Sequence, residues 1–210
     1  MRVVGPLAVA FLALMASRAW AWCDSTDACL RAIEESQRST RALSARFEQT
    51  KHLSLMNEPL VSRGRFAFKQ PDQVLWQIDE PAITVRIDRN GVHLPNLPNA
   101  EAEVAALGPF SNMMRELSGV FTGSLGTVRK NFDVHANGDA AAIHVRLVPR
   151  NAQWQRMFRS VELSFAMPDL TMKTIHIDEA LGDSLDIVFT DVHRNDAVAE
   201  AAFSNGAPLP

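Results

Sequence analysis

The chain has no tyrosine, only two cysteines and no surplus of basic residues. Two cysteines cannot staple a chain of 210 residues, which excludes a disulfide-rich scaffold. Lys and Arg number 21 against 24 Asp and Glu, so the net charge of −3 argues against a nucleic-acid-binding protein, which would show a basic face. Hydrophobic residues make up 47% of the chain, which excludes intrinsic disorder and predicts one globular domain.

Long apolar runs are also missing, except at the N-terminus. Val3–Ala16 is almost uninterrupted after Arg2, and Ala19-Trp20-Ala21 fits the A-x-A cleavage rule. This run of about 14 residues is too short to span a bilayer. We therefore predict a cleaved secretory signal peptide at residues 1–21, followed by a single soluble domain at residues 22–210 in the periplasm.

The motifs of common enzymes are absent. The sequence contains no G-x-S-x-G elbow, no H-E-x-x-H motif, no Walker loop and no dinucleotide fingerprint. The six histidines are scattered, and we expect His135, His144 and His176 to face solvent rather than to bind a metal. The acidic residues at 178–186 lack the spacing of a calcium loop and are interpreted as a solvated turn. We expect no enzymatic activity, no metal and no cofactor.

The two cysteines require a separate decision. Cys23 follows Trp22, whereas an acylated lipoprotein cysteine would follow a small residue, so we reject lipidation. Cys23 and Cys29 lie six residues apart in a chain expected to be exported, which favours a disulfide. The alternative is two unpaired thiols near a frayed terminus.

Hydrophobic periodicity divides the chain into helical and alternating segments. A helix is predicted from Asp27 to about Arg41, with Asp27 as its N-cap, and residues 101–121 carry a broad apolar stripe at helical spacing. Alternation of apolar and polar residues predicts strands at 43–48, 65–69, 74–79, 83–88, 132–135, 143–147, 161–165, 174–177 and 185–190. The expected fold is α+β: a strongly curved antiparallel sheet (an incomplete β-barrel) with a helical lid over its apolar concave face.

An apolar face under a lid can enclose an acyl chain, or it can simply form the core. The candidate lining residues of the sheet are Phe47, Phe66, Phe68, Trp76, Ile78 and Phe165, and those of the lid are Phe110, Met113, Met114, Leu117 and Phe121. Arg65 and Lys69 are candidates for steering phosphate or carboxyl groups at the rim. The alternative for both is ordinary solvent-facing charge.

An ordered set of motifs resembles the periplasmic outer membrane lipoprotein carrier (LolA) family over nearly all of the chain after residue 21. The set comprises Phe47-x-Gln49, the strand at Gly64, Pro71, Trp76, Pro81, Asp88-x-x-Gly91, Leu147-x-Pro149, Val161-x-Leu163, Ile175-x-Ile177 and Gly182-Asp183. The resemblance implies a monomeric soluble shuttle with a hydrophobic cavity. Such a shuttle receives lipoprotein acyl chains from an inner-membrane transporter and passes them to an outer-membrane receptor.

Two departures from the family pattern indicate a divergent paralogue. Gln70 replaces the basic residue that commonly holds the family's lid shut, and His93-Leu94-Pro95 replaces an aromatic pair. The cargo is then either a lipoprotein or another apolar envelope lipid, such as an acyl-linked pigment. The alternative function is a periplasmic lipid-sensing regulatory domain of the same fold that docks a membrane signalling protein.

Overall fold

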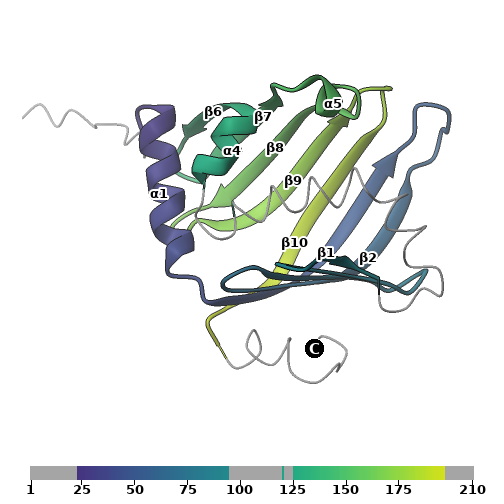
Figure 1. The fold of residues 1–210 in the computed structure, drawn as a ribbon, viewed down its shortest axis with the longest axis horizontal. Helices are drawn as coiled ribbons and strands as arrows, with labels where there is room; N and C mark the ends of the chain where they lie inside the picture. Colours follow the sequence, from purple (N-terminus) through teal and green to yellow (C-terminus); the bar gives the residue numbers. More distant parts are fainter. Residues whose placement is uncertain (1–22, 95–119, 121–124, 197–210) are drawn as a thin grey trace, which may run out of the picture.

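Ten antiparallel strands form one curved sheet (Figure 1). The computed structural model of the chain describes residues 23–94, 120 and 125–196. The strands are β1 (Ala42–His52), β2 (Leu60–Lys69), β3 (Gln73–Ile78), β4 (Ile83–Asp88), β5 (Gly91–His93), β6 (Phe132–Gly138), β7 (Ala142–Pro149), β8 (Phe158–Ala166), β9 (Thr171–Glu179) and β10 (Ser184–Arg194). Their spatial order is β5-β4-β3-β2-β1-β10-β9-β8-β7-β6.

Two meanders of five strands make up the sheet, and the pairing of β1 with β10 joins them. Within each meander every strand pairs with its neighbour in the sequence, as short turns require. In the described part of the chain, the edge strands β5 and β6 do not pair with each other, so the barrel is incomplete. The sheet bends strongly: β3–β5 lie edge-on below β6–β10, which are seen from their face (Figure 1).

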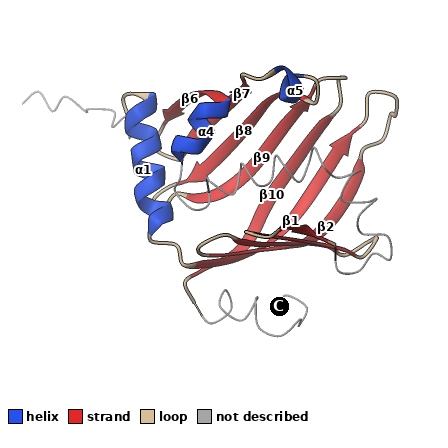
Figure 2. Cartoon of the chain, viewed as in Figure 1, coloured by secondary structure: helices blue, strands red, loops and turns tan. Residues whose placement is uncertain are grey.

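Successive side chains alternate between a concave and a convex face. The concave face is apolar along almost every strand, and its buried residues belong to one continuous hydrophobic core. The convex face carries mainly charged and hydroxyl side chains, including the exposed His135 and His144. The expected fold class, an open antiparallel barrel with few helices, is confirmed (Figure 2).

Helix α1 (Thr26–Arg38) covers β6 at one end of the sheet. It buries Cys29, Leu30, Ile33 and Gln37, a stripe at helical spacing. Asp27 is not the N-cap. The cap is Ser25, whose hydroxyl accepts a hydrogen bond from the Ala28 amide at 3.2 Å.

Other differences from the sequence-based expectations are local. Helix α5 (Ala152–Gln155) was not predicted, because four residues are too few to show a helical period. Helix α4 (Leu125–Asn131) was not predicted either, and it includes Gly126. The helical segment expected at 101–121 lies outside the described residues, except Val120, which is helical and buried. Among the helices that the structure describes, none is long and apolar enough to cross a membrane.

Candidate ligand-binding site

Four aromatic rings form a cluster on the concave face of the sheet. They come from four different strands, β1, β2, β3 and β10, and are Phe47, Phe66, Trp76 and Phe189. The centroids of Phe47 and Trp76 are 4.2 Å apart, and Phe66 lies 5.8 Å from Trp76 in an edge-on arrangement. Phe189 lies 5.6 Å from Phe66. We call these four residues the aromatic cluster.

The strand register explains why these rings meet. Trp76 is directly opposite Phe66 in the β2–β3 ladder, and Phe47 is directly opposite Phe189 in the β1–β10 ladder. Directly opposed residues of antiparallel strands point to the same face. Gly64 lies opposite Phe47 in β2 and leaves room for its ring.

Phe68 and Ile78 extend this apolar surface along β2 and β3. Phe68 is fully buried, whereas Ile78 is half-buried and packs against the edge of the core. The alternation that predicted these residues also contained Phe189, in the segment Leu185-Asp-Ile-Val-Phe189, but Phe189 was not singled out as a site residue. The structure therefore adds Phe189 to the candidate site.

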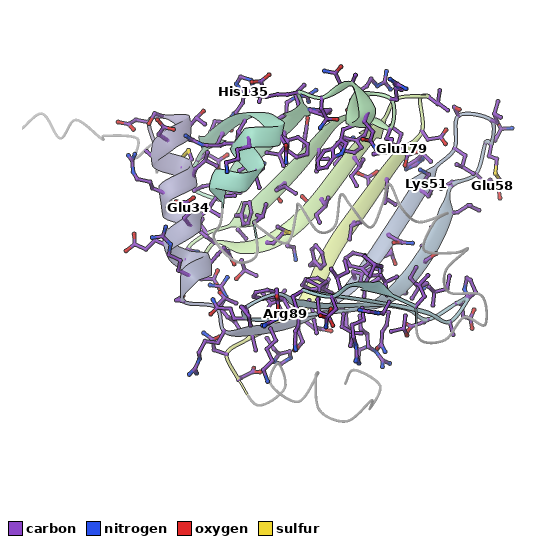
Figure 3. All side chains as sticks on the ribbon, viewed as in Figure 1. Glu34, Lys51, Glu58, Arg89, His135 and Glu179 are labelled. Carbon is purple, nitrogen blue, oxygen red and sulfur yellow. A yellow bond between two sulfur atoms is a disulfide. The ribbon has the colours of Figure 1, made fainter. Side chains whose placement is uncertain are left out.

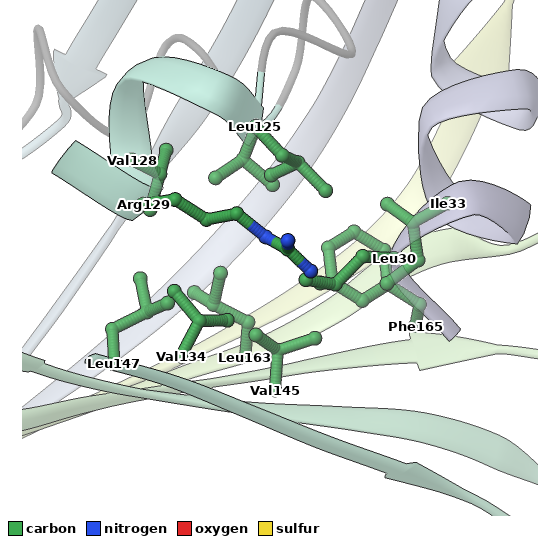
Figure 4. Close-up of a pocket in the computed structure, with 11 residues that line it drawn as sticks. Leu30, Ile33, Leu125, Val128, Arg129, Val134, Val145, Leu147, Leu163 and Phe165 are labelled. Carbon is green, nitrogen blue, oxygen red and sulfur yellow. The ribbon is translucent and has the colours of Figure 1, made fainter. Parts of the chain in front are cut away.

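Phe165 lies in the other half of the sheet, beneath α1 and α4. It lines a small apolar cavity between these helices and strands β6–β8, together with Leu30, Ile33, Val120, Leu125, Val128, Val134, Val145, Leu147 and Leu163 (Figure 4). The cavity has about 10 Å³ of free volume, which is the space of one water molecule. Phe165 therefore lines this cavity and does not join the aromatic cluster.

Arg129 of α4 crosses the opening of that cavity (Figure 4). Its guanidinium pairs with the Asp27 carboxylate of α1, and this contact ties the two helices together. The Arg129 hydrogen bond and charge lower the pKa of Asp27. Both side chains are largely exposed, so the pair orients the helices more than it stabilises them.

A second ion pair marks the opposite end of the concave face. Lys51 and Glu179 pair where β1 and β9 end (Figure 3). Lys51 shares the face of Phe47, because it lies opposite Leu185 in the β1–β10 ladder. Gln49 lies between them, so the concave side of β1 changes from apolar to polar toward His52.

Arg65 and Lys69 do not lie with the aromatic cluster. Arg65 is opposite Arg46 and Gln77, and Lys69 is opposite Gln73, all on the convex face. Their strand positions therefore point both cations away from the concave face, and the expected role at the rim stays a prediction.

The expected lid residues Phe110, Met113, Met114, Leu117 and Phe121 lie outside the described residues. Gln70, the departure from the family pattern, lies just after β2. Its side chain donates to the carbonyl of Arg38 at the end of α1, at 3.4 Å.

Cys23 and Cys29 are joined by a disulfide. Both cysteines are buried. The bond connects the segment before α1 to Cys29, the fourth residue of the helix. Thr26 adds a tie to β6, because its hydroxyl donates to the Ala136 carbonyl at 3.3 Å and accepts from the Ala136 amide at 3.1 Å.

The histidines behave as solvent-facing groups of the convex side. Asp186 Oδ1 lies 2.6 Å from His176 Nδ1, and Asp178 Oδ1 lies 3.4 Å from His176 Nε2. The hydrogen bond to Asp186 raises the pKa of His176, although partial burial opposes the shift. No group of three or more potential metal ligands occurs among the residues that the structure describes.

Two hairpin tips expose large apolar side chains next to each other. Leu55 of the β1–β2 loop is 98% exposed, and Leu181 of the β9–β10 turn is 89% exposed. The loops are connected, because the Ser54 amide donates to Asp183 Oδ1 at 2.8 Å. Exposed apolar groups gathered in this way are typical of interaction surfaces.

An open antiparallel barrel with an apolar concave face and helices at one end defines the class of lipoprotein-carrier-like folds. The family model described as outer membrane lipoprotein carrier protein LolA matches residues 38–205. The chain belongs to this family, as a divergent member.

Solved structures share the fold at low sequence identity. MucB has a TM-score of 0.53 and 15% identity, over 88% of this chain and 64% of that one. A LolA superfamily protein from Nitrosomonas europaea has a TM-score of 0.46 and 9% identity, over 87% and 99% of the two chains. A DUF1329 family protein from Desulfovibrio piger has a TM-score of 0.47 and 11% identity, over 90% and 100%. No significant match was found among curated proteins.

Proposed function

We propose that this protein is a non-enzymatic periplasmic carrier that binds the acyl chains of lipoproteins or related envelope lipids. The observation that carries the proposal is the apolar concave face of the open barrel, floored by the aromatic cluster. Concave apolar surfaces with few polar groups are the usual sites for hydrocarbon ligands. Membership of the lipoprotein carrier family supports acyl groups as the cargo.

We also propose a route for the cargo, from the inner membrane to the outer membrane. The signal peptide expected at residues 1–21 and the Cys23–Cys29 disulfide both support an oxidising envelope compartment. The carrier, as a monomer, takes cargo from an inner-membrane lipoprotein-releasing transporter and delivers it to an outer-membrane receptor. This route follows from the family resemblance.

A binding and transfer assay tests the proposal. The delipidated mature protein is titrated with a fluorescent fatty acid, and movement of a palmitoylated peptide between two populations of vesicles is then followed. Ile78→Ser removes an apolar side chain from the half-buried edge of the concave face and should weaken probe binding several-fold. Val188→Ser is the matched control, because Val188 is 41% exposed on the convex face, and its binding should equal wild type. Failure of the wild-type protein to bind the probe would overturn the proposal.

The alternative is a lipid-sensing regulatory domain that docks a membrane signalling protein. The exposed hairpin tips at Leu55 and Leu181 favour it, because such tips suit a partner surface. A sensor binds the acyl probe but moves no palmitoylated peptide between vesicles. Under this alternative, the double variant Leu55→Ser/Leu181→Ser loses partner docking and keeps probe binding.

A further inference from the structure

The indole N–H of Trp76 is buried without a hydrogen-bond partner. Trp76 is 2% exposed, and within the described part of the chain its Nε1 has no acceptor. Buried N–H groups in folded proteins are nearly always paired, because an unsatisfied donor loses its bonds to water and gains nothing in return. Indole offers a donor only, so an acceptor must come from elsewhere.

The described residues around Trp76 supply no side-chain acceptor for this donor. In the strand ladders Trp76 lies between Phe66 and Val85, and its ring contacts Phe47 and Phe189. None of these side chains carries an oxygen or nitrogen atom. The donor therefore belongs to an apolar surface that is otherwise suited to hydrocarbon.

We propose that Trp76 Nε1 donates a hydrogen bond to the carbonyl oxygen of a bound acyl ester or amide. This inference rests on the proposed carrier function and deepens it, because it assigns one residue to the carbonyl linkage of the acyl group. The concave face then recognises both parts of the cargo: the rings contact the chain, and the indole N–H contacts the linkage.

The chemistry of the site favours a neutral acceptor. A carboxylate or phosphate beside Trp76 would be a buried charge, and the four side chains around the indole supply no cation to compensate it. The Lys51 ammonium, on the same face of β1, is already paired with Glu179. An ester or amide carbonyl accepts one hydrogen bond without bringing charge into the apolar surface.

Two probes with the same number of carbon atoms but different chemistry test the inference. Methyl palmitate carries an ester carbonyl, and heptadecane carries none. Both are titrated into the ¹⁵N-labelled mature protein while the indole ¹H–¹⁵N resonances are recorded. The Trp76 resonance is assigned in the wild-type protein from through-space contacts with the rings of Phe47 and Phe66, so this readout needs no variant.

We expect the Trp76 indole proton to shift downfield with methyl palmitate and not with heptadecane. Trp76→Phe should weaken the binding of methyl palmitate roughly threefold to tenfold more than it weakens the binding of heptadecane, because one hydrogen bond has about this effect. Trp154→Phe is the control, because that buried indole packs against Phe132 and Phe158, outside the aromatic cluster. It should change neither affinity.

The two levels of the proposal fail in different ways. If both probes bind but the Trp76 indole does not shift with the ester, or if Trp76→Phe weakens both probes equally, the hydrogen bond is disproved and the carrier function stands. If the wild-type protein binds neither probe, the carrier function and the hydrogen bond are both disproved.

Discussion

The ring of Phe47 occupies the space that a side chain at position 64 would need. A Cβ built on Gly64 would lie 2.6 Å from Phe47 Cζ and would also collide with the backbone carbonyl of Gln77. The aromatic cluster thus depends on a glycine in the neighbouring strand. Only hydrogen at position 64 lets β1, β2 and β3 approach while Phe47 stacks near Trp76.

We expect Gly64→Ala to destabilise the fold by about 1–3 kcal/mol, the usual cost of overpacking a core. The carbonyl of Gln77 belongs to the backbone and cannot move away as a flexible side chain would. Chemical denaturation of the purified variant measures this loss.

Gly126→Ala is the matched control. A Cβ at Gly126 meets nothing within 4 Å, and the residue lies inside α4. Alanine should stabilise this helix by about 0.5–1 kcal/mol. Equal effects of the two substitutions would show that the Phe47–Gly64 contact is not the cause.

The protonation of His176 should make the stability of the fold depend on pH. The hydrogen bond to Asp186 raises the pKa of His176, so the folded chain binds the proton more tightly than the unfolded chain does. The resulting stabilisation is fully present below the ordinary histidine pKa of about 6.5 and is lost as the pH rises through the folded value. An NMR titration of His176 should give a pKa above the ordinary value.

Asp186→Asn should return the His176 pKa toward its ordinary value, because the variant lacks the carboxylate that accepts the hydrogen bond from the imidazolium. The His176→Gln variant should lose less stability than the wild-type protein as the pH rises above the ordinary histidine pKa of about 6.5. A His176 pKa that is the same in Asp186→Asn as in the wild-type protein would contradict this interpretation.

Reduction of the Cys23–Cys29 disulfide should destabilise the domain by about 2 kcal/mol, the loop-entropy expectation for a short loop. The expected result is a lower denaturation midpoint in the presence of a reductant. The double variant Cys23→Ala/Cys29→Ala should start from the lower midpoint and show no response to the reductant. A wild-type midpoint that does not change on complete reduction would contradict this prediction.

Gln37 connects α1 to the turn between β8 and β9 through a hydrogen bond. Its buried side-chain amide donates to the Leu170 carbonyl at 2.9 Å. Gln37→Leu keeps the volume but leaves that carbonyl without its donor, and should cost about 1–3 kcal/mol in unfolding free energy. The nearby Ser39→Ala removes an exposed hydrogen bond to the Ser36 carbonyl and should cost about 0.5 kcal/mol or less.

Alternation was sufficient to predict most strands and the apolar face that carries Phe47, Phe66 and Trp76, because burial on one face dictates a period of two. The same alternation points the side chains of Arg65 and Phe66 to opposite faces of the sheet. The alternative interpretation of Arg65 and Lys69, ordinary solvent-facing charge on a strand, follows from this alternation. The structure puts both on the convex face.

Other features depend on contacts that no local pattern contains. The pairing of β1 with β10 joins segments about 140 residues apart, and alternation does not identify a strand's partner. The unsatisfied indole of Trp76 is visible only once its neighbours are known. The sequence could not distinguish Ser25 from Asp27 as the N-cap of α1, because both residue types are good caps. In the structure Ser25 caps the helix and Asp27 pairs with Arg129.

The β1–β10 ladder also dictates the order in which the molecule can be assembled. The two central strands of the sheet come from opposite ends of the folded domain, so β1 has one unpaired edge until β10 has been synthesised and delivered. Such long-range pairing slows folding. Until it forms, the unpaired edge of β1 can pair with other chains. The two meanders can form early but can join only when β10 reaches β1, so the pairing of these two strands completes the sheet.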